Sequence, residues 1–208
     1  YEDIRKIKPD IIMVSSTGYG FTGPWANFGA TGPATEGASG LAFMTGYRDG
    51  PPVMSEIPYT DYTSSEATVF AIMTALMHQL GTGQGQFVDI SQTQASSATV
   101  PEALMDYSAN GRTAPRIGNE DSAMAPHGCY PCTGQDRWIA IAVATDPQWK
   151  SLCQVLNRED WLEDSRFADG LSRWRHRLAL DELLSPVTQG WDSKDLMDQL
   201  QSAGVAAG

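Results

Sequence analysis

Residues 10–24 read DIIMVSSTGYGFTGP, and this stretch decides the fold class. The apolar run from Ile11 to Val14 follows Pro9 and is typical of a buried strand over 10–16. Closely spaced glycines then break the strand. Ligands of open α/β sheets bind at the carboxyl ends of strands, so this loop is either a ligand-binding loop or a surface turn.

A long helix is predicted over residues 63–80, where apolar residues recur with the spacing of one helical face: Val69, Ile72, Met73, Leu76, Met77 and Leu80. Thr63 and Glu66 have the spacing of a capping box, and Gly81 and Gly83 supply the stop. A shorter helix over 34–44 precedes it. A strand over 87–90 and a helix over 93–107 follow, which predicts an α/β fold.

The second half of the chain has a different pattern. Residues 110–136 lack periodicity and are rich in Gly and Pro, which indicates a linker. A strand over 138–144 then leads to a helix over 147–156 capped by Asp146, and to amphipathic stretches near 161–167, 175–188 and 193–203. We therefore predict part of a large α/β domain over 1–109, a linker over 110–136 and a smaller α+β domain over 137–208.

The ends of the sequence suggest a piece of a longer protein. It begins with Tyr1 and has no leader pattern, and it stops in small residues after an amphipathic stretch. We expect a missing N-terminal segment and a small domain that is incomplete at its C-terminus.

Composition excludes several classes of function. A net charge of −11 without a basic cluster argues against nucleic acid as a partner. No run of about eighteen apolar residues exists, so we expect no membrane partner. Three cysteines without secretory context indicate the cytoplasm. Cys129 and Cys132 form a C-x-x-C after His127, but no second Cys/His pair lies near, so we expect no metal.

Asp61 is the strongest chemical candidate. It lies just ahead of the predicted long helix, where the macrodipole favours a carboxylate over a carboxylic acid. A carboxylate can attack an activated acyl group if N–H donors meet the oxyanion. The spacing alone favours a simple helix cap. Neither the other carboxylates nor His78, His127 and His176 form an acid/base pair or a G-x-S-x-G motif.

An ordered series of motifs resembles the class III CoA-transferases. It comprises SSTGYG over 15–20, TGP over 22–24, Ser39-Gly40, Thr45-Gly46, DGPP over 49–52, Asp61 before a helix, GTGQGQ over 81–86 and AGVAAG over 203–208. This family includes formyl-CoA and carnitine CoA-transferases and α-methylacyl-CoA racemase. The resemblance implies a Rossmann-like large domain, a smaller domain reached by linkers, and an interlocked homodimer.

The resemblance also implies the reaction. Asp61 would attack an acyl-CoA thioester to give a mixed anhydride, CoA would return to form an aspartyl-CoA thioester, and a carboxylic acid would then accept CoA in ping-pong fashion. CoA is a substrate here, and no bound cofactor is required. By the same resemblance, Asp61 is catalytic, and the residues expected to contact substrate or CoA are Gly18, Gly20, Gly29, Ala30, Thr31, His127 and Gly128.

Two departures from the family pattern leave alternatives open. Where the family commonly has Tyr or His followed by Asp or Glu, this chain has Thr31-Gly32. Thr31 cannot act as a proton-transfer base, which disfavours racemisation. Residues 124–128, which match a shielding glycine-rich loop, contain few glycines. A racemase or isomerase of the same fold and a non-catalytic subunit of a heteromeric enzyme are the alternatives. We interpret Arg112, Arg116 and residues 25–28 as pocket candidates, although an arginine in such a stretch is more often simply on a solvated loop.

Overall fold

The computed structural model describes residues 1–208 as a mixed α/β chain that divides into two compact units. Unit 1 comprises Tyr1–Gly118 and unit 2 comprises Asn119–Gly208. The division falls inside the stretch 110–136 that the sequence predicts as a linker. That stretch also contains strand β3 (His127–Pro131), which belongs to unit 2. The Rossmann-like description of the large domain stays a prediction.

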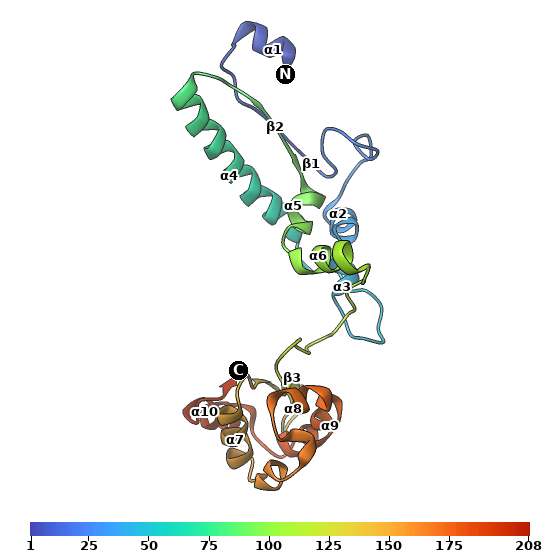
Figure 1. Cartoon of the computed structure of the whole chain (residues 1–208), viewed down its shortest axis with the longest axis vertical. Helices are drawn as coiled ribbons and strands as arrows, with labels where there is room; N and C mark the ends of the chain where they lie inside the picture. Colours follow the sequence, from blue (N-terminus) through green and yellow to red (C-terminus); the bar gives the residue numbers. More distant parts are fainter. The chain divides into compact units, whose positions relative to one another are not determined.

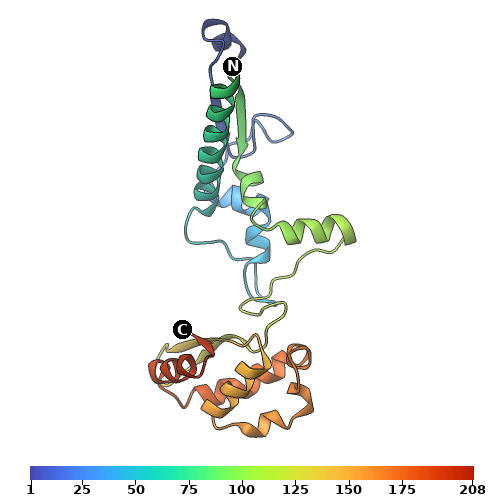
Figure 2. The ribbon, with the colours of Figure 1, turned by 60° about the vertical axis from the view of Figure 1, so that its left-hand side comes forward.

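Unit 1 is built around two parallel strands, β1 (Met13–Thr17) and β2 (Phe87–Ser91). Their register pairs Met13 with Phe87 and Thr17 with Ser91, so the two strands end together. The chain between them forms α2 (Gly32–Ser39), α3 (Leu41–Met44) and α4 (Tyr59–Thr82). Helix α4 runs back along the strands (Figure 1, Figure 2), as a crossover between parallel strands requires. Helix α1 (Glu2–Ile7) precedes the sheet.

The predicted capping box of the long helix is wrong. Helix α4 begins at Tyr59, with Pro58 at the N-cap and no side-chain cap. Thr63 lies in the second turn, and its hydroxyl donates to the carbonyl of Tyr59 at 3.2 Å and contacts Ser96 Oγ at 2.8 Å. The N–H groups of Tyr59 and Asp61 in the first turn donate instead to the backbone carbonyls of Ile57 and Pro58, so the helix starts there without a capping side chain.

The helix predicted over 93–107 is two helices, α5 (Gln92–Ser97) and α6 (Pro101–Asn110). Proline has no backbone N–H and disfavours helical backbone in the residue before it, so Pro101 begins a new helix. Ser91 caps α5 by accepting a hydrogen bond from the Gln94 N–H. The first turn of α5 therefore lies directly at the end of β2.

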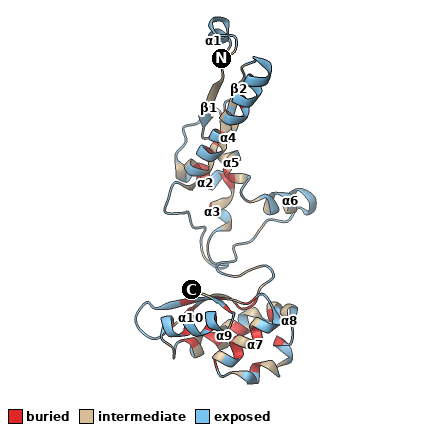
Figure 3. Cartoon of the chain, turned by 90° about the vertical axis from the view of Figure 1, so that its left-hand side faces the viewer, coloured by how far each residue is buried: buried red, intermediate tan, exposed pale blue.

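The apolar side of α4 is largely exposed within these residues (Figure 3). Met77 and Leu80 are 67% and 81% exposed, and Ala75 is the buried apolar residue of this helix. The sequence pattern predicts the helix correctly, but the two-stranded sheet is too narrow to cover that side.

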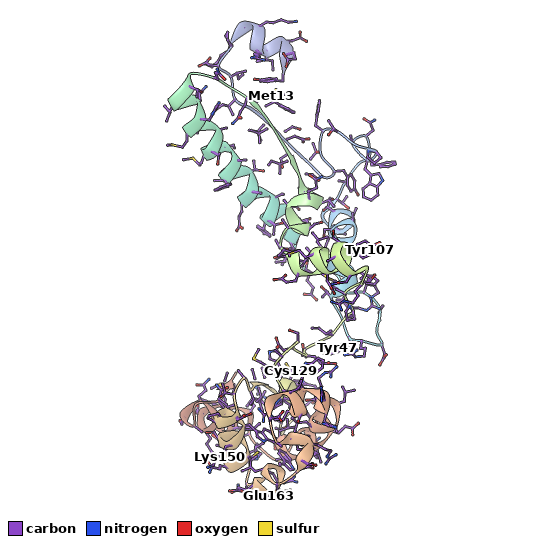
Figure 4. The ribbon with its side chains drawn as sticks, in the orientation of Figure 1. Met13, Tyr47, Tyr107, Cys129, Lys150 and Glu163 are labelled. Carbon is purple, nitrogen blue, oxygen red and sulfur yellow. The ribbon has the colours of Figure 1, made fainter.

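Unit 2 has a well-packed core under a three-stranded antiparallel sheet, β3, β4 (Trp138–Ala142) and β5 (Ala206–Ala207). Its helices are α7 (Asp146–Val155), α8 (Gly170–Arg175), α9 (Arg177–Thr188) and α10 (Ser193–Ser202), with two 3-10 turns at Glu159–Leu162 and Ser165–Phe167. Trp149 stacks on Trp161 with ring centroids 6.1 Å apart. Buried side chains are dense in this unit (Figure 3, Figure 4).

The predicted Asp146 cap is also wrong. Thr145 caps α7 in a capping box with Gln148, because its hydroxyl oxygen, one residue earlier, accepts the Gln148 N–H. Asp146 instead pairs with Arg173, whose side chain is 1% exposed. Arg173 Nη2 lies 2.7 Å from Asp146 Oδ1, while the same guanidinium donates to the carbonyls of Ala125 and Phe167.

The C-x-x-C residues belong to the sheet of unit 2 and are free thiols. Cys129 lies on β3 (Figure 4) and is exposed, whereas Cys132 is buried in the core. Burial raises the pKa of the Cys132 thiol. Across residues 1–208, His, Cys, Asp and Glu side chains form no group of three that could hold a metal ion. None of the helices is long and apolar enough to cross a membrane.

Arg173 provides a test of the unit 2 core. We predict that Arg173→Leu lowers the free energy of unfolding by about 2–4 kcal/mol, because two buried carbonyls lose their donor. Asp146→Asn, at the exposed end of the same pair, should cost less than about 1 kcal/mol. Urea denaturation followed by tryptophan fluorescence reports mainly on unit 2, which holds five of the six tryptophans. Equal losses in the two variants would contradict this account.

Candidate functional site

Asp61 lies where several elements of unit 1 converge. It occupies the first turn of α4, near the carboxyl ends of β1 and β2 and the first residues of α2 and α5. Its side chain is half-buried. Since parallel strands place their carboxyl ends at one edge, residues that follow β1 and β2 meet the start of the helix that returns between them.

Asp61 does not cap the helix, so the interpretation of this residue as a simple N-cap is wrong. Its backbone N–H donates to the carbonyl of Pro58 at 3.0 Å, and no side-chain cap closes the end of α4. The carboxylate instead accepts a hydrogen bond at Oδ1 from Gln92 Nε2, at 2.8 Å. Its other oxygen, Oδ2, faces Gly32, where an added Cβ would lie 3.5 Å away.

Two buried polar contacts hold the elements around Asp61. The hydroxyls of Thr35 on α2 and Thr60 on α4 are 2.7 Å apart, and both residues are fully buried. Glu36, also on α2, is buried and accepts hydrogen bonds at 2.7 Å from the N–H and the hydroxyl of Ser55. These contacts fix the segment that leads into α4, and therefore fix the backbone of Asp61.

The glycine-rich loop after β1 packs closely on the same region. An added Cβ at Gly18 would lie 2.1 Å from the Cβ of Ala30, which leaves no room for a side chain. The carbonyl of Gly18 accepts from the N–H of Thr93 at 3.0 Å and from its hydroxyl at 2.9 Å. Gly20 is buried with φ +89°, a conformation that favours glycine. The loop thereby joins β1 to the start of α5.

Comparisons with known proteins identify the family of this chain. The model of CoA-transferase family III matches residues 1–208. The chain belongs to CoA-transferase family III. A solved CAIB/BAIF family protein from Brucella suis superposes with a TM-score of 0.89 at 32% identity, over 100% of this chain and 55% of that one.

Curated relatives of this family III chain are named CoA-transferases. A succinate–glutarate CoA-transferase of Agrobacterium fabrum is 31% identical over 100% of this chain and 52% of its own length. An acetyl-CoA:oxalate CoA-transferase of Acetobacter aceti is 32% identical over 100% of this chain and 53% of its own length. The chain thus spans about half the length of these relatives.

Most of the site residues that the sequence predicts lie in unit 1. Gly29, Ala30 and Thr31 lie on the exposed segment that enters α2, and Thr31 is the N-cap residue of that helix without a side-chain cap bond. Gly18 lies against Ala30, whereas Gly20 lies against Ser91 at the end of β2. Their contacts with substrate or CoA stay a prediction.

His127 and Gly128 belong to β3 of unit 2. His127 Nδ1 lies 2.6 Å from the carbonyl oxygen of Asn119, and Gly128 lies against the hydroxyl of Tyr130. Burial raises the pKa of Tyr130, whose hydroxyl donates to Asp181 at 2.6 Å. The role of these two residues in substrate binding likewise stays a prediction.

The pocket candidates from the sequence lie in different environments. Trp25 lines a pocket of about 230 Å³ with Tyr19. Arg112 lines a separate, mainly apolar pocket of about 190 Å³ beside Tyr107, but its guanidinium already pairs with Asp106 at 2.6 Å. Arg116 lies over the ring of Phe43 and donates to the carbonyl of that residue at 3.0 Å.

The sequence reasoning missed Gln92 and the position of Gly32. Gln92 is separated from Asp61 by 31 residues, and no motif marks it. The rule that ligands bind at the carboxyl ends of parallel strands could have singled it out, because it directly follows β2. Gly32 was noted only as a departure from the family pattern.

A pair of glycines tests the packing of the loop. We predict that Gly18→Ala destabilises unit 1 by about 1–3 kcal/mol, because the new methyl overlaps Ala30. Gly37→Ala, in α2 with open space around it, should be neutral or stabilising by up to about 1 kcal/mol. Hydrogen exchange of the β1 and α5 amides measures both effects. Unchanged protection in Gly18→Ala would show that the loop does not pack as described.

Proposed function

We propose that the protein transfers coenzyme A from an acyl-CoA to a carboxylic acid, with Asp61 as the covalent nucleophile. The observation that carries the proposal is the asymmetric environment of its carboxylate. Gln92 donates a hydrogen bond to Oδ1, whereas Oδ2 accepts none and faces Gly32, a residue without a side chain. Membership of CoA-transferase family III supports the same reaction class.

The proposed reaction proceeds in two matched halves. A carboxylate oxygen of Asp61 attacks the carbonyl carbon of the thioester, and the C–S bond breaks with its electron pair passing to sulfur. The CoA thiolate then attacks Cγ of the resulting anhydride, which releases the donor acid and leaves an aspartyl-CoA thioester. The acceptor carboxylate repeats these steps in reverse order, so the cycle needs neither a redox partner nor a bound cofactor.

The names of the relatives narrow the proposed substrates. Succinate, glutarate and oxalate, which occur in those names, are short dicarboxylic acids. We infer that the acids used here belong to this class. Racemisation of an acyl-CoA is disfavoured, because Thr31 stands where a histidine base would be needed and its hydroxyl does not titrate near neutral pH.

The remaining expectations about the whole protein stay predictions. They are an interlocked homodimer and a cytoplasmic location. Net charge of −11 means that CoA phosphates would be bound by backbone N–H groups, by isolated arginines or by segments outside residues 1–208.

Chemical trapping of the intermediate tests the proposal. We predict that the full-length protein, incubated with succinyl-CoA and hydroxylamine, acquires a hydroxamate at Asp61 that peptide mass spectrometry locates. Asp61→Ala should lose the adduct and at least about 10³-fold of the turnover, because the covalent route is closed.

Glu66→Gln is the matched control, since it removes an exposed carboxylate from the same helix. It should retain both the hydroxamate and the turnover. A hydroxamate that persists in Asp61→Ala, or none in wild type with any short dicarboxylic acyl-CoA that binds, would overturn the proposal and favour the isomerase or the non-catalytic subunit.

A further inference from the structure

Hydrogen bonds of the neighbouring residues fix the position of Gln92 beside Asp61. It is the first residue of α5, a helix that Ser91 caps. The next residue, Thr93, is hydrogen-bonded twice to the carbonyl of Gly18. Further along α5, Ser96 Oγ contacts the hydroxyl of Thr63 on α4 at 2.8 Å. The hydrogen bond of 2.8 Å from Gln92 Nε2 to Asp61 Oδ1 therefore joins α5 and α4, which other hydrogen bonds already fix to each other.

The contacts distinguish the two carboxylate oxygens of Asp61. Oδ1 accepts the hydrogen bond from Gln92, which occupies one of its lone pairs. Oδ2 accepts no hydrogen bond and faces Gly32, which has no side chain to cover it. Oδ2 is therefore the oxygen placed for attack, and Oδ1 is the oxygen that remains on Cγ.

We propose that Gln92 is a second catalytic residue, an oxyanion donor for the steps that occur at Cγ of Asp61. This inference rests on the proposed function. When the CoA thiolate attacks Cγ, a new S–C bond forms and the electron pair of the Cγ=Oδ1 double bond moves to Oδ1. Collapse restores that double bond and breaks the Cγ–Oδ2 bond, whose electron pair leaves with the donor carboxylate. Oδ1 carries the full negative charge between these events, and Gln92 Nε2 already donates to it.

A neutral donor suits both halves of the cycle. The negative charge on Oδ1 is shared in the free carboxylate, falls in the anhydride and in the thioester, and is greatest in the tetrahedral intermediates at Cγ. A fixed N–H donor therefore stabilises those intermediates most. A lysine or arginine at this position would form an ion pair with the free carboxylate and reduce its nucleophilicity. A glutamine amide stabilises the oxyanion without that cost.

The proposal predicts a change in which intermediate accumulates. In Gln92→Leu, attack of thiolate on Cγ should slow by about 10²–10³-fold, the usual effect of removing one oxyanion donor. Formation of the anhydride should not slow, because that step removes charge from Asp61. Rapid-quench mass spectrometry of the full-length protein with succinyl-CoA distinguishes the two adducts, since one adds the succinyl group and the other adds CoA. We expect the succinyl adduct to accumulate in the variant and the CoA adduct to disappear at early times.

Two further variants keep the test decisive. Gln92→Met has nearly the same size and no charge but lacks the amide donor, so it should also lose the early CoA adduct, even if Gln92→Leu fails to fold. Gln84→Leu removes an exposed glutamine of unit 1 whose side chain makes no hydrogen bond, and it should behave like wild type.

The outcomes separate this inference from the proposed function. If wild type forms both adducts and the Gln92 variants lose them in parallel, Gln92 only supports the structure and the inference is wrong. The inference would also be overturned if the Gln92 variants kept the wild-type ratio of succinyl to CoA adduct and formed the CoA adduct at the wild-type rate. If wild type forms no adduct at Asp61, the proposed function itself fails, and the inference falls with it.

Discussion

The parallel pairing of β1 with β2 is the constraint on which the site depends. Parallel strands cannot be joined by a tight turn, so the chain must cross back, and it does so through α4. The helix therefore starts beside the carboxyl ends of both strands. This topology brings together the loop of Gly18, the first turn of α4 with Asp61 and the first residue of α5, Gln92. Residues from three separate parts of the chain meet because of one strand pairing.

Local sequence patterns predicted the presence of helices and strands better than the residues at which they begin and end. The apolar run after Pro9 and the helical face from Val69 to Leu80 correctly predicted β1 and α4. The predicted start of α4 was wrong because backbone carbonyls of Ile57 and Pro58 accept from the first-turn N–H groups, so no capping side chain marks the true start at Tyr59. The same periodicity could not show that the apolar side of α4 stays exposed within residues 1–208, since a pattern predicts a face and not the segment that covers it.

Only part of the candidate site could be predicted from the sequence, and the reason is physical. Asp61 could be singled out because its position near the start of a helix and the ordered motifs around it are both local features of the sequence. Gln92 and Gly32 could not, because their importance lies in distances across the fold: a hydrogen bond of 2.8 Å to Oδ1, and a residue without a side chain beside Oδ2. Gly32 as a sequence departure looked like the loss of a contact, whereas in the structure it lies beside Oδ2 of Asp61.

The central claim is that Asp61 carries the transferred group while Gln92 contacts its remaining oxygen. The most direct measurement is a crystal structure of the full-length protein frozen after a short soak with succinyl-CoA. The account predicts continuous density between Asp61 Cγ and the CoA sulfur, with Gln92 Nε2 at hydrogen-bond distance from Oδ1. An intact thioester bound with unmodified Asp61, or an adduct on a different side chain, would contradict it.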